Sequence, residues 1–132
     1  IQAKNIQVAL DLSSRSAINV NRGEIQQVLL NLINNAIQAL SESTRSSRML
    51  RIESRDVSGG IQLLISDNGG GVPIDAQMHL FELLSNSNKR SGMGLGLWLC
   101  QHIVSRHGGR IRYEDAPSGG AQFTVFLPST QE

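Results

Sequence analysis

The apolar positions between residues 24 and 40 recur at steps of three and four, which is the period of one helix face. A stripe at this spacing predicts a helix whose apolar side packs on a core. Asn21 is a plausible N-cap, because Glu24 follows it at the spacing of a capping box. The stripe consists of Ile25, Val28, Leu29, Leu32, Ile33, Ala36, Ile37 and Leu40.

Runs of alternating or β-branched residues predict strands on both sides of this helix. A Ser-Gly-Gly turn at residues 58–60 predicts that two of them form a hairpin. Two further helices are predicted, a short amphipathic one at 74–84 and one at 92–107 that ends at a Gly-Gly pair. The predicted strands are residues 6–12, 17–20, 49–56, 61–66, 110–114 and 121–127.

The order β β α β β α α β β predicts an α/β (α+β) fold, a two-layer sandwich. Its sheet should be mixed but mostly antiparallel, with the helices on one face. At 132 residues, 39% hydrophobic and 17% charged, we expect a single globular domain over residues 1–132. Because the chain starts at Ile1 without a Met, we expect it to be a fragment of a larger protein.

Composition excludes several classes of function. The net charge is +1 with scattered basic residues, so nothing favours nucleic acid as a partner. Cys100 is the single cysteine, which excludes an internal disulfide and any multi-cysteine metal site. No apolar run approaches the length of about 18 residues that suggests a membrane span, so we expect no direct membrane contact.

The polar face of the first helix carries an unusual set of carboxamides, Asn31, Asn35 and Gln38. Asn is a mediocre helix former, so its presence here favours a role in binding. Carboxamides one turn apart offer oxygen ligands and hydrogen-bond donors without adding charge. The alternative is a solvated polar face in which the Asn residues are incidental, and this stretch alone leaves both interpretations open.

Asp67 follows an apolar strand and precedes three consecutive glycines, Gly69 to Gly71. A carboxylate at a strand end can accept a hydrogen bond from an exocyclic amine such as that of adenine. Glycines without side chains would let a flat ring approach the backbone. The alternative is a plain turn, because Asp-Asn-Gly is a favoured turn sequence.

The motif GMGLGL at residues 92–97 leads directly into a helix. Unpaired N–H groups and the positive end of the helix dipole at such a start form a cradle for phosphate. The motif is not a Walker loop, because no Gly-Lys-Ser/Thr follows, and no strand precedes it as in a dinucleotide fold. The alternative is a flexible hinge.

Together, NLINNA, DNGGG, FELL, GMGLGL and GGAQFTVFLP resemble the ATP-binding domain of sensor histidine kinases. This is the GHKL family with the Bergerat fold, and the resemblance covers residues 6–128. It is closest to the nitrogen-fixation oxygen sensors and nitrogen-regulation kinases. Asn31 and Asn35 match the N box, Asp67, Gly69 and Gly71 the G1 box, Phe81 and Glu82 the F box, and Gly92, Gly94 and Gly96 the G2 box.

The resemblance implies binding of the cofactors ATP and Mg²⁺ and donation of the γ-phosphate to a histidine on a separate dimerisation domain. It implies catalytic roles for Asn31 and Lys89, a Mg²⁺ ligand in Asn35, and an ATP lid at about residues 85–94. The implied ATP-binding set is Asn31, Asn35, Gln38, Asp67, Gly69, Gly71, Val72, Phe81, Lys89, Arg90, Gly92, Met93, Gly94, Leu95, Gly96, Leu97 and Thr124.

The sequence departs from the family pattern in several places. Gln38 stands where many members carry Lys, and the F box has one extra residue before Lys89, so either Lys89 or Arg90 would contact phosphate. Met93 and Ala121 replace common threonines. The ATPase relatives carry a general-base Glu at the position of Asn31, which disfavours the first alternative, a GHKL ATPase. The second is a degenerate nucleotide-binding docking domain.

His79, His102 and His107 all lie outside the family's phosphoacceptor pattern, so we expect them to be structural or surface residues. The phosphorylated histidine would lie upstream of Ile1, in the dimerisation domain. The resemblance further implies a response regulator as partner, a monomeric fragment, and a cytoplasmic domain whose parent can be anchored in the inner membrane.

Overall fold

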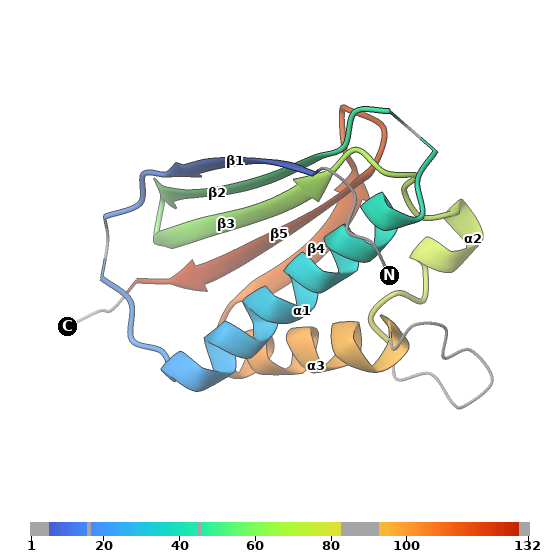
Figure 1. The fold of residues 1–132 in the computed structure, drawn as a ribbon. Coiled ribbons are helices and arrows are strands. Elements are labelled where there is room, and N and C mark those ends of the chain that lie inside the picture. Colours follow the sequence, from blue (N-terminus) through green and yellow to red (C-terminus); the bar gives the residue numbers. More distant parts are fainter. Residues whose placement is uncertain (1–5, 16, 45, 83–92, 130–132) are drawn as a thin grey trace.

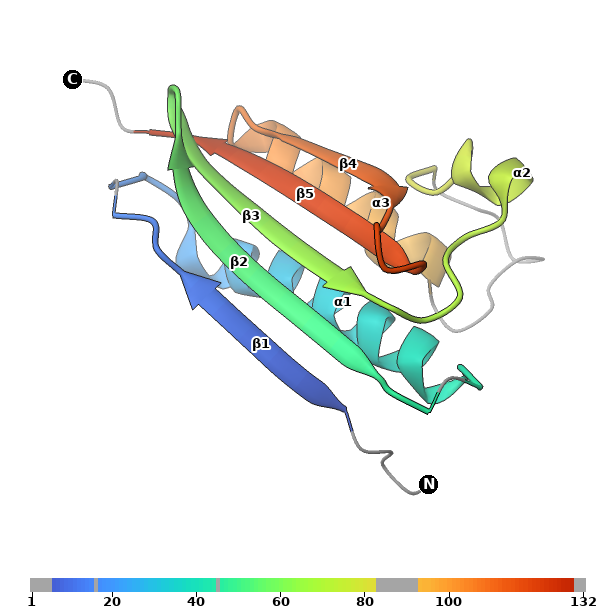
Figure 2. The ribbon, with the colours of Figure 1, turned by 90° about the horizontal axis from the view of Figure 1, so that it is seen from above.

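The computed structural model describes residues 6–15, 17–44, 46–82 and 93–129 of the chain. They form one five-stranded sheet with the helices on one of its faces (Figures 1 and 2). This confirms the predicted two-layer α/β sandwich. The elements are β1 (Gln7–Leu12), α1 (Arg22–Ser41), β2 (Met49–Val57), β3 (Gly60–Asp67), α2 (Ile74–Gln77), α3 (Met93–Arg106), β4 (Arg110–Asp115) and β5 (Ala121–Pro128).

The sheet has the strand order β1-β2-β3-β5-β4. β1 runs parallel to β2, and the other three pairs are antiparallel, as predicted for a mixed sheet. The β2–β3 pair is the predicted hairpin, in which Val57 pairs with Gly60.

Helix α1 begins where the sequence predicts. The side-chain oxygen of Asn21 accepts a hydrogen bond from the Glu24 amide at 2.9 Å, which satisfies a backbone donor that has no partner within the helix. Helix α3 ends before Gly108, which has a φ of +80°. A left-handed residue at this position is the usual end of a helix, and Gly adopts it without strain.

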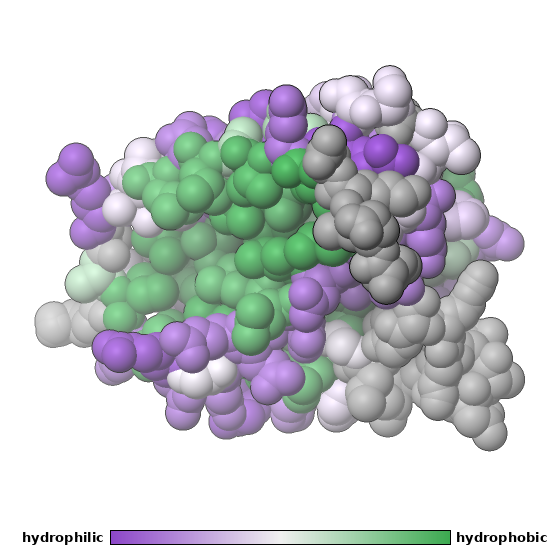
Figure 3. Space-filling model, in the orientation of Figure 1, coloured by the Kyte–Doolittle hydropathy of each residue, from purple (hydrophilic) through white to green (hydrophobic). Residues whose placement is uncertain are grey.

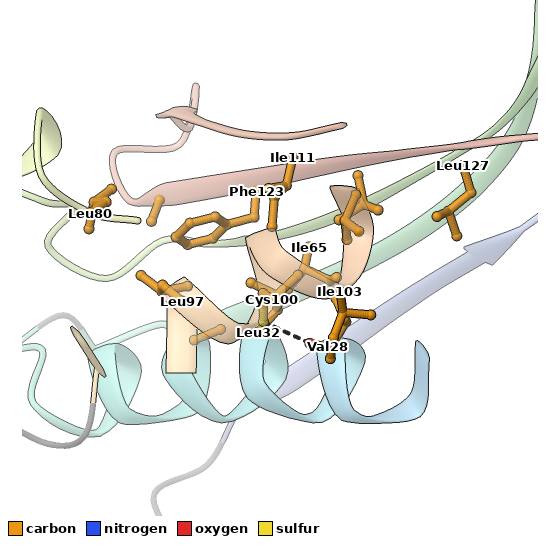
Figure 4. Close-up of a cluster of buried hydrophobic side chains, with 14 of the residues drawn as sticks. Val28, Leu32, Ile65, Leu80, Leu97, Cys100, Ile103, Ile111, Phe123 and Leu127 are labelled. Atoms are coloured by element: carbon orange, nitrogen blue, oxygen red, sulfur yellow. Dashed lines mark hydrogen bonds between the residues drawn. The ribbon is translucent and has the colours of Figure 1, made fainter. Parts of the chain in front are cut away.

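The core lies between the helices and the sheet (Figure 4). Val28, Leu32, Ala36 and Leu40 of α1 are at most 4% exposed, so the centre of the predicted stripe is buried, whereas Ile37 in the same stripe is 38% exposed. α1 and α3 lie side by side on the same sheet face (Figure 2). Figure 4 shows Cys100 of α3 against Val28, where its thiol donates to the Val28 carbonyl at 3.7 Å.

The predicted strand at residues 17–20 is wrong, because this segment has no ladder partner and no strand structure. The chain leaves β1 at Ser13, whose amide donates to the Ser54 carbonyl at 2.9 Å. The Arg15 amide then donates to the Asp56 carboxylate at 3.0 Å. The Asp56 side chain thus replaces a backbone partner after Ser13, and Ile18 packs against the core without a strand around it.

Residues 83 and 84 of the predicted helix at 74–84 lie outside the described part, and within residues 74–82 only Ile74–Gln77 is helical. The chain continues in tight turns, in which the amides of Leu80 and Glu82 donate to carbonyls three residues earlier. These turns bury Leu80 and leave Met78 76% exposed. Burial of Leu80 against the core therefore replaces continuation of the helix.

Apolar side chains also gather on the surface, between β1 and α1 (Figure 3). Val8, Leu10 and Leu12 of β1 are each more than half exposed, because neither helix of the main layer extends over this edge strand. Among the described residues, the structure contains no helix that is long and apolar enough to cross a membrane.

Candidate functional site

Asp67 lies at the end of β3 and is only 4% exposed. Its Oδ1 accepts hydrogen bonds from the amide of Gly69 at 2.8 Å and from that of Ala121 at 3.4 Å. No described residue donates to its other carboxylate oxygen. The carboxylate is therefore oriented by the backbone and keeps an acceptor for a ligand.

The environment of Asp67 disfavours its charge. Burial raises the pKa of the carboxyl above its ordinary value of 3.8, while the hydrogen bonds from Gly69 and Ala121 oppose this rise. Gly120 packs directly against Asp67 and only glycine fits there, because a Cβ would strike the Asp67 carbonyl oxygen. A desolvated carboxylate in a fixed orientation suits recognition of a hydrogen-bond donor such as an amine.

The glycine loop after Asp67 passes against the last turn of α1. A Cβ on Gly69 would lie 3.1 Å from the Ala39 carbonyl oxygen, so the loop and the helix approach closely. Gly71 has a φ of +76°, which favours glycine at this position. Gly70 has no neighbour within 4 Å of an added Cβ, so the middle of the loop is open to a ligand.

The carboxamide face of α1 meets the start of α3. Asn31 donates from Nδ2 to the Gly96 carbonyl at 3.5 Å, and a Cβ on Gly96 would lie 3.8 Å from the Asn31 Cγ. One turn further, the Asn35 Nδ2 is buried without a hydrogen-bond partner among the described residues. Since buried amides are rarely left unpaired, this group indicates a site that a ligand completes.

Cys100 lies beside this face but has the properties of a core residue. It is fully buried, and this burial raises the pKa of its thiol to about 11, against a smaller lowering by a hydrogen bond with Asn31. The thiol is therefore neutral at ordinary pH, which agrees with the structural role suggested by its apolar helix.

Aromatic side chains join the segment after α2 to the sheet. Phe81, half-buried, meets Phe123 edge to face, with ring centroids 6.1 Å apart. Tyr113 meets the same Phe123 ring at 5.4 Å. Packing against the core thus fixes the position of Phe81. The Glu82 side chain, in contrast, is exposed and contacts His79 at 3.0 Å.

The other predicted site residues differ in burial, and several lie outside the described part of the chain. The Leu97 side chain is 1% exposed and belongs to the core, so only its backbone could face a ligand. Gln38 is exposed and donates to Glu42 at 3.3 Å. The backbone of residues 93–95 forms the first turn of α3, with side chains outside the described part. Lys89, Arg90, Gly92 and residues 85–92 of the predicted lid lie outside the described residues.

Thr124, a predicted ATP contact, lies apart from the other predicted residues. Phe123 and Val125 face the helix-side core, so alternation along β5 places Thr124 on the opposite face of the sheet. There it lines a hollow of about 360 Å³ together with Gln62 and Arg112. Asp67 belongs to the helix-side end of the sheet, and the two side chains do not share a site.

The sequence prediction did not name two residues of the candidate site, Gly120 and Asn68. Gly120 makes room for Asp67, and the Gly-Gly pair before the last strand is the sequence feature that could have indicated it. Asn68 fixes the start of the glycine loop, since its Oδ1 accepts from the Met49 amide at 2.8 Å and its Nδ2 donates to the Ser47 carbonyl at 2.9 Å. Only the tertiary fold gives Asn68 these partners, so its sequence predicted no more than a turn.

The histidines have neighbours that suit structural or surface roles. His107 hydrogen-bonds the Ile103 carbonyl through Nδ1, and its Nε2 accepts from the Asn21 amide at 3.0 Å, which ties the end of α3 to the start of α1. His102 stacks on Trp98 with ring centroids 5.2 Å apart.

Residues 20–131 match the family model described as histidine kinase-, DNA gyrase B- and HSP90-like ATPase. The chain is 37% identical to the signal transduction histidine-protein kinase AtoS of Escherichia coli over 134 residues, covering 97% of this chain and 21% of AtoS. It is 35% identical to the sensor protein FixL of Bradyrhizobium diazoefficiens over 131 residues, covering 98% of this chain and 25% of FixL.

The solved catalytic domain of the histidine kinase ThkA has the same fold, with a TM-score of 0.79 at 26% identity over 96% of this chain and 82% of that one. The chain therefore belongs to the histidine kinase-, gyrase- and HSP90-like ATPase family. Within the family it corresponds to the ATP-binding catalytic domain of two-component sensor histidine kinases. It spans only a quarter or less of AtoS and FixL.

Proposed function

We propose that this domain binds Mg·ATP and donates the γ-phosphate to a histidine on a separate dimerisation domain of its protein. A response regulator would then take the phosphoryl group. Such a domain would work in the cytoplasm, where ATP is present. The relatives that share nearly the whole of this chain are sensor kinases, which supports this assignment.

The observation that carries the proposal is the meeting of segments far apart in the sequence. Asp67 is buried and oriented at one side, Gly69 approaches Ala39 of α1, and Asn31 of the same helix touches Gly96 at the start of α3. An adenine acceptor, an open glycine loop and a helix N-terminus suited to phosphate thus border one region (Figure 1).

Asn35 is the proposed Mg²⁺ ligand, and the residues present fit that ion. The ligand would be its side-chain oxygen, and one carboxamide oxygen suffices because Mg²⁺ keeps several waters and binds phosphate oxygens. Its buried Nδ2, which has no partner among the described residues, is a donor and would suit a phosphate oxygen beside the ion. Among the described residues, no group of three His, Cys, Asp or Glu could hold a metal by itself, which agrees with an ion that arrives with its nucleotide. When bound, Mg²⁺ would neutralise phosphate charge.

The chain's own contribution is placement. Asp67 would hold the adenine amine, the glycine loop would admit the ring, and the amides at the start of α3 would meet the phosphates. Phosphoryl transfer depends mainly on such positioning and on charge neutralisation. A neutral imidazole is already nucleophilic, so the domain needs no strong base, and Asn31 supplies none.

The test is a transfer assay with γ-labelled ATP and a longer polypeptide that carries this chain and the histidine-bearing helices of its protein. We expect acid-labile phosphohistidine on those helices. Release of free phosphate by this chain alone would support an ATPase instead, and binding without transfer would support a docking domain.

The control variant is Asp11→Asn, which removes the same charge as Asp67→Asn from an exposed position on edge strand β1. Labelling should be lost in Asp67→Asn and retained in Asp11→Asn. Equal labelling of both variants would remove Asp67 from the nucleotide site.

A further inference from the structure

The two backbone polar groups of Val72 are both held by side chains. The Val72 amide donates to the Tyr113 hydroxyl at 3.1 Å, and the Val72 carbonyl accepts from the Gln77 side-chain amide at 2.8 Å. Val72 lies directly after the glycine loop and belongs to no helix or strand. Side chains from β4 and α2 thus satisfy the backbone hydrogen-bonding groups of Val72, as a neighbouring strand would within a sheet.

The same two side chains meet at a common acceptor, Asp115. The Tyr113 hydroxyl donates to Asp115 Oδ1 at 3.0 Å, and Gln77 donates to that oxygen at 3.2 Å. A carboxylate can only accept, so the Tyr113 proton must point to Asp115 and its lone pair to Val72. The direction of every hydrogen bond in the ring is therefore fixed.

The position of the Tyr113 hydroxyl is fixed by packing. Its ring meets Phe123 edge to face, and Phe123 in turn meets Phe81. Burial raises the pKa of the Tyr113 hydroxyl to about 12, with a smaller opposing effect of its bond to Val72, so the proton is present throughout the working range. The hydroxyl is a rigid, permanently neutral anchor.

The opposite end of the glycine loop is anchored independently. Asn68 bonds the Met49 amide and the Ser47 carbonyl, as described above. Between Asn68 and Val72, Gly70 has open space around it, so the loop is fixed at both ends and open at its middle residue. Fixing the ends lowers the entropy that a ligand must overcome when it orders the loop.

We propose that Tyr113, Asp115 and Gln77 are positioning residues that hold the β3–α2 loop in the form that accepts the nucleotide. They act through Val72 and do not touch the ligand. This inference rests on the proposed function, since it assumes that the loop borders the nucleotide.

The test compares conservative variants of the 132-residue chain by titration with β,γ-imido-ATP and Mg²⁺ and by hydrogen exchange of the Val72 amide. Tyr113→Phe keeps the ring and removes the hydroxyl, so the Val72 amide should exchange at least about tenfold faster, because its acceptor is gone. Affinity for the analogue should fall about three- to tenfold, the effect of one lost neutral hydrogen bond.

Asp115 provides a rescue pair. Asp115→Asn keeps an acceptor oxygen and should bind the analogue within about twofold of wild type, whereas Asp115→Leu should resemble Tyr113→Phe. Gln77→Met should also weaken binding, and its matched control, Gln26→Met, changes an exposed residue of α1 and should not.

The outcomes separate the two claims. If the wild-type chain binds no analogue, the proposed function fails and this inference falls with it. If the wild type binds and Tyr113→Phe binds equally, the positioning role is overturned even where Val72 exchange rises. Unchanged exchange at Val72 in Tyr113→Phe would overturn the hydrogen-bond ring itself.

Discussion

At the scale of single residues, the buried carboxylate of Asp67 suits ligand binding but lowers the stability of the unliganded chain. Asp67→Asn keeps an oxygen that can accept from Gly69 and Ala121, but it presents a donor to the adenine amine. We expect the affinity for ATP to fall by about 1–3 kcal/mol or more, the cost of a mismatched buried pair, as measured by calorimetry. The unfolding free energy of the unliganded chain should not fall, since the buried charge is gone.

The pH dependence of Asp67 has a definite sign. Its pKa is raised in the folded state, so the folded chain binds this proton more tightly than the unfolded chain. This group's contribution to stability is therefore present below about pH 3.8 and is lost as pH rises through the folded-state value. Asp67→Asn should remove that loss in denaturant titrations across acidic pH. An identical pH profile in wild type and variant would contradict the prediction.

For Asn35→Ala we predict loss of Mg²⁺ binding with little change in stability. Because its Nδ2 has no described partner, Asn35→Ala should change the unfolding free energy of the unliganded chain by less than about 1 kcal/mol. The adenine contacts survive, so the variant should still bind ATP, but the gain in affinity on adding Mg²⁺ should disappear. A wild-type gain in the variant would exclude Asn35 as a ligand.

At the scale of elements, the turn before β5 determines whether β3 can present Asp67. In Gly120→Ala the new methyl would strike the Asp67 carbonyl, so β3 and the turn must separate. We expect a loss of about 1–3 kcal/mol in unfolding free energy, typical of overpacking, with loss of nucleotide binding. Chemical denaturation and calorimetry would measure both.

Gly70→Ala is the matched control, because it introduces the same methyl into the loop where nothing lies within 4 Å. Its stability should stay within about 0.5 kcal/mol of wild type, as for most surface changes. A loss as large as that of Gly120→Ala would show that the clash with Asp67 does not explain the effect.

The sequence predicted most elements because their signals are local. The i, i+3, i+4 stripe of α1, its Asn21 cap and the Gly-Gly turn of the β2–β3 hairpin each act within a few residues. The prediction for residues 17–20 failed because a strand needs a neighbour. The chain before them is held by β2 side chains, since Ser54 Oγ accepts from the Ser14 amide and Asp56 from the Arg15 amide.

The motifs predicted which segments of the candidate site meet, whereas contacts that depend only on the tertiary fold were missed. Asn31 touches Gly96 and Gly69 touches Ala39, as the N, G1 and G2 motifs imply. Thr124 lies on the sheet face opposite the helices, and the motif gave no sign of this, since a single step along a strand moves a side chain to the other face. Tyr113 could not be found, because its partner Val72 is 41 residues away.

At the scale of the whole molecule, the site lies at one end of the sandwich. The end of β3, the β4–β5 turn, α2 and the start of α3 gather there, while the start of α1 and the end of α3 meet at the opposite end (Figure 1). His107 and Asn21 hold that opposite end together. Loops and helix termini therefore border the candidate site, and they can adapt to a ligand while the sheet stays rigid.

We expect Asn31 to decide whether this domain donates phosphate or hydrolyses ATP. The ATPase relatives named by the resemblance carry Glu at this position, so Asn31→Glu would place a carboxylate beside the Gly96 carbonyl and remove the present donor. A well-placed general base is worth about 10²–10⁴-fold, and a graft without supporting residues should give far less, about tenfold. Phosphate release should be measured at saturating ATP, because the added charge also weakens binding.

The isolated wild-type chain should release almost no phosphate, and Asn31→Glu measurably more. Asn31→Gln is the control for side-chain length, since it has the same reach and retains a donor but offers no base. It should hydrolyse ATP no faster than wild type. If Gln and Glu raise hydrolysis equally, the gain comes from altered packing against α3 and not from a base. Rapid turnover by the wild type would instead show that Asn31 does not keep water inactive, and the ATPase interpretation would replace the kinase one.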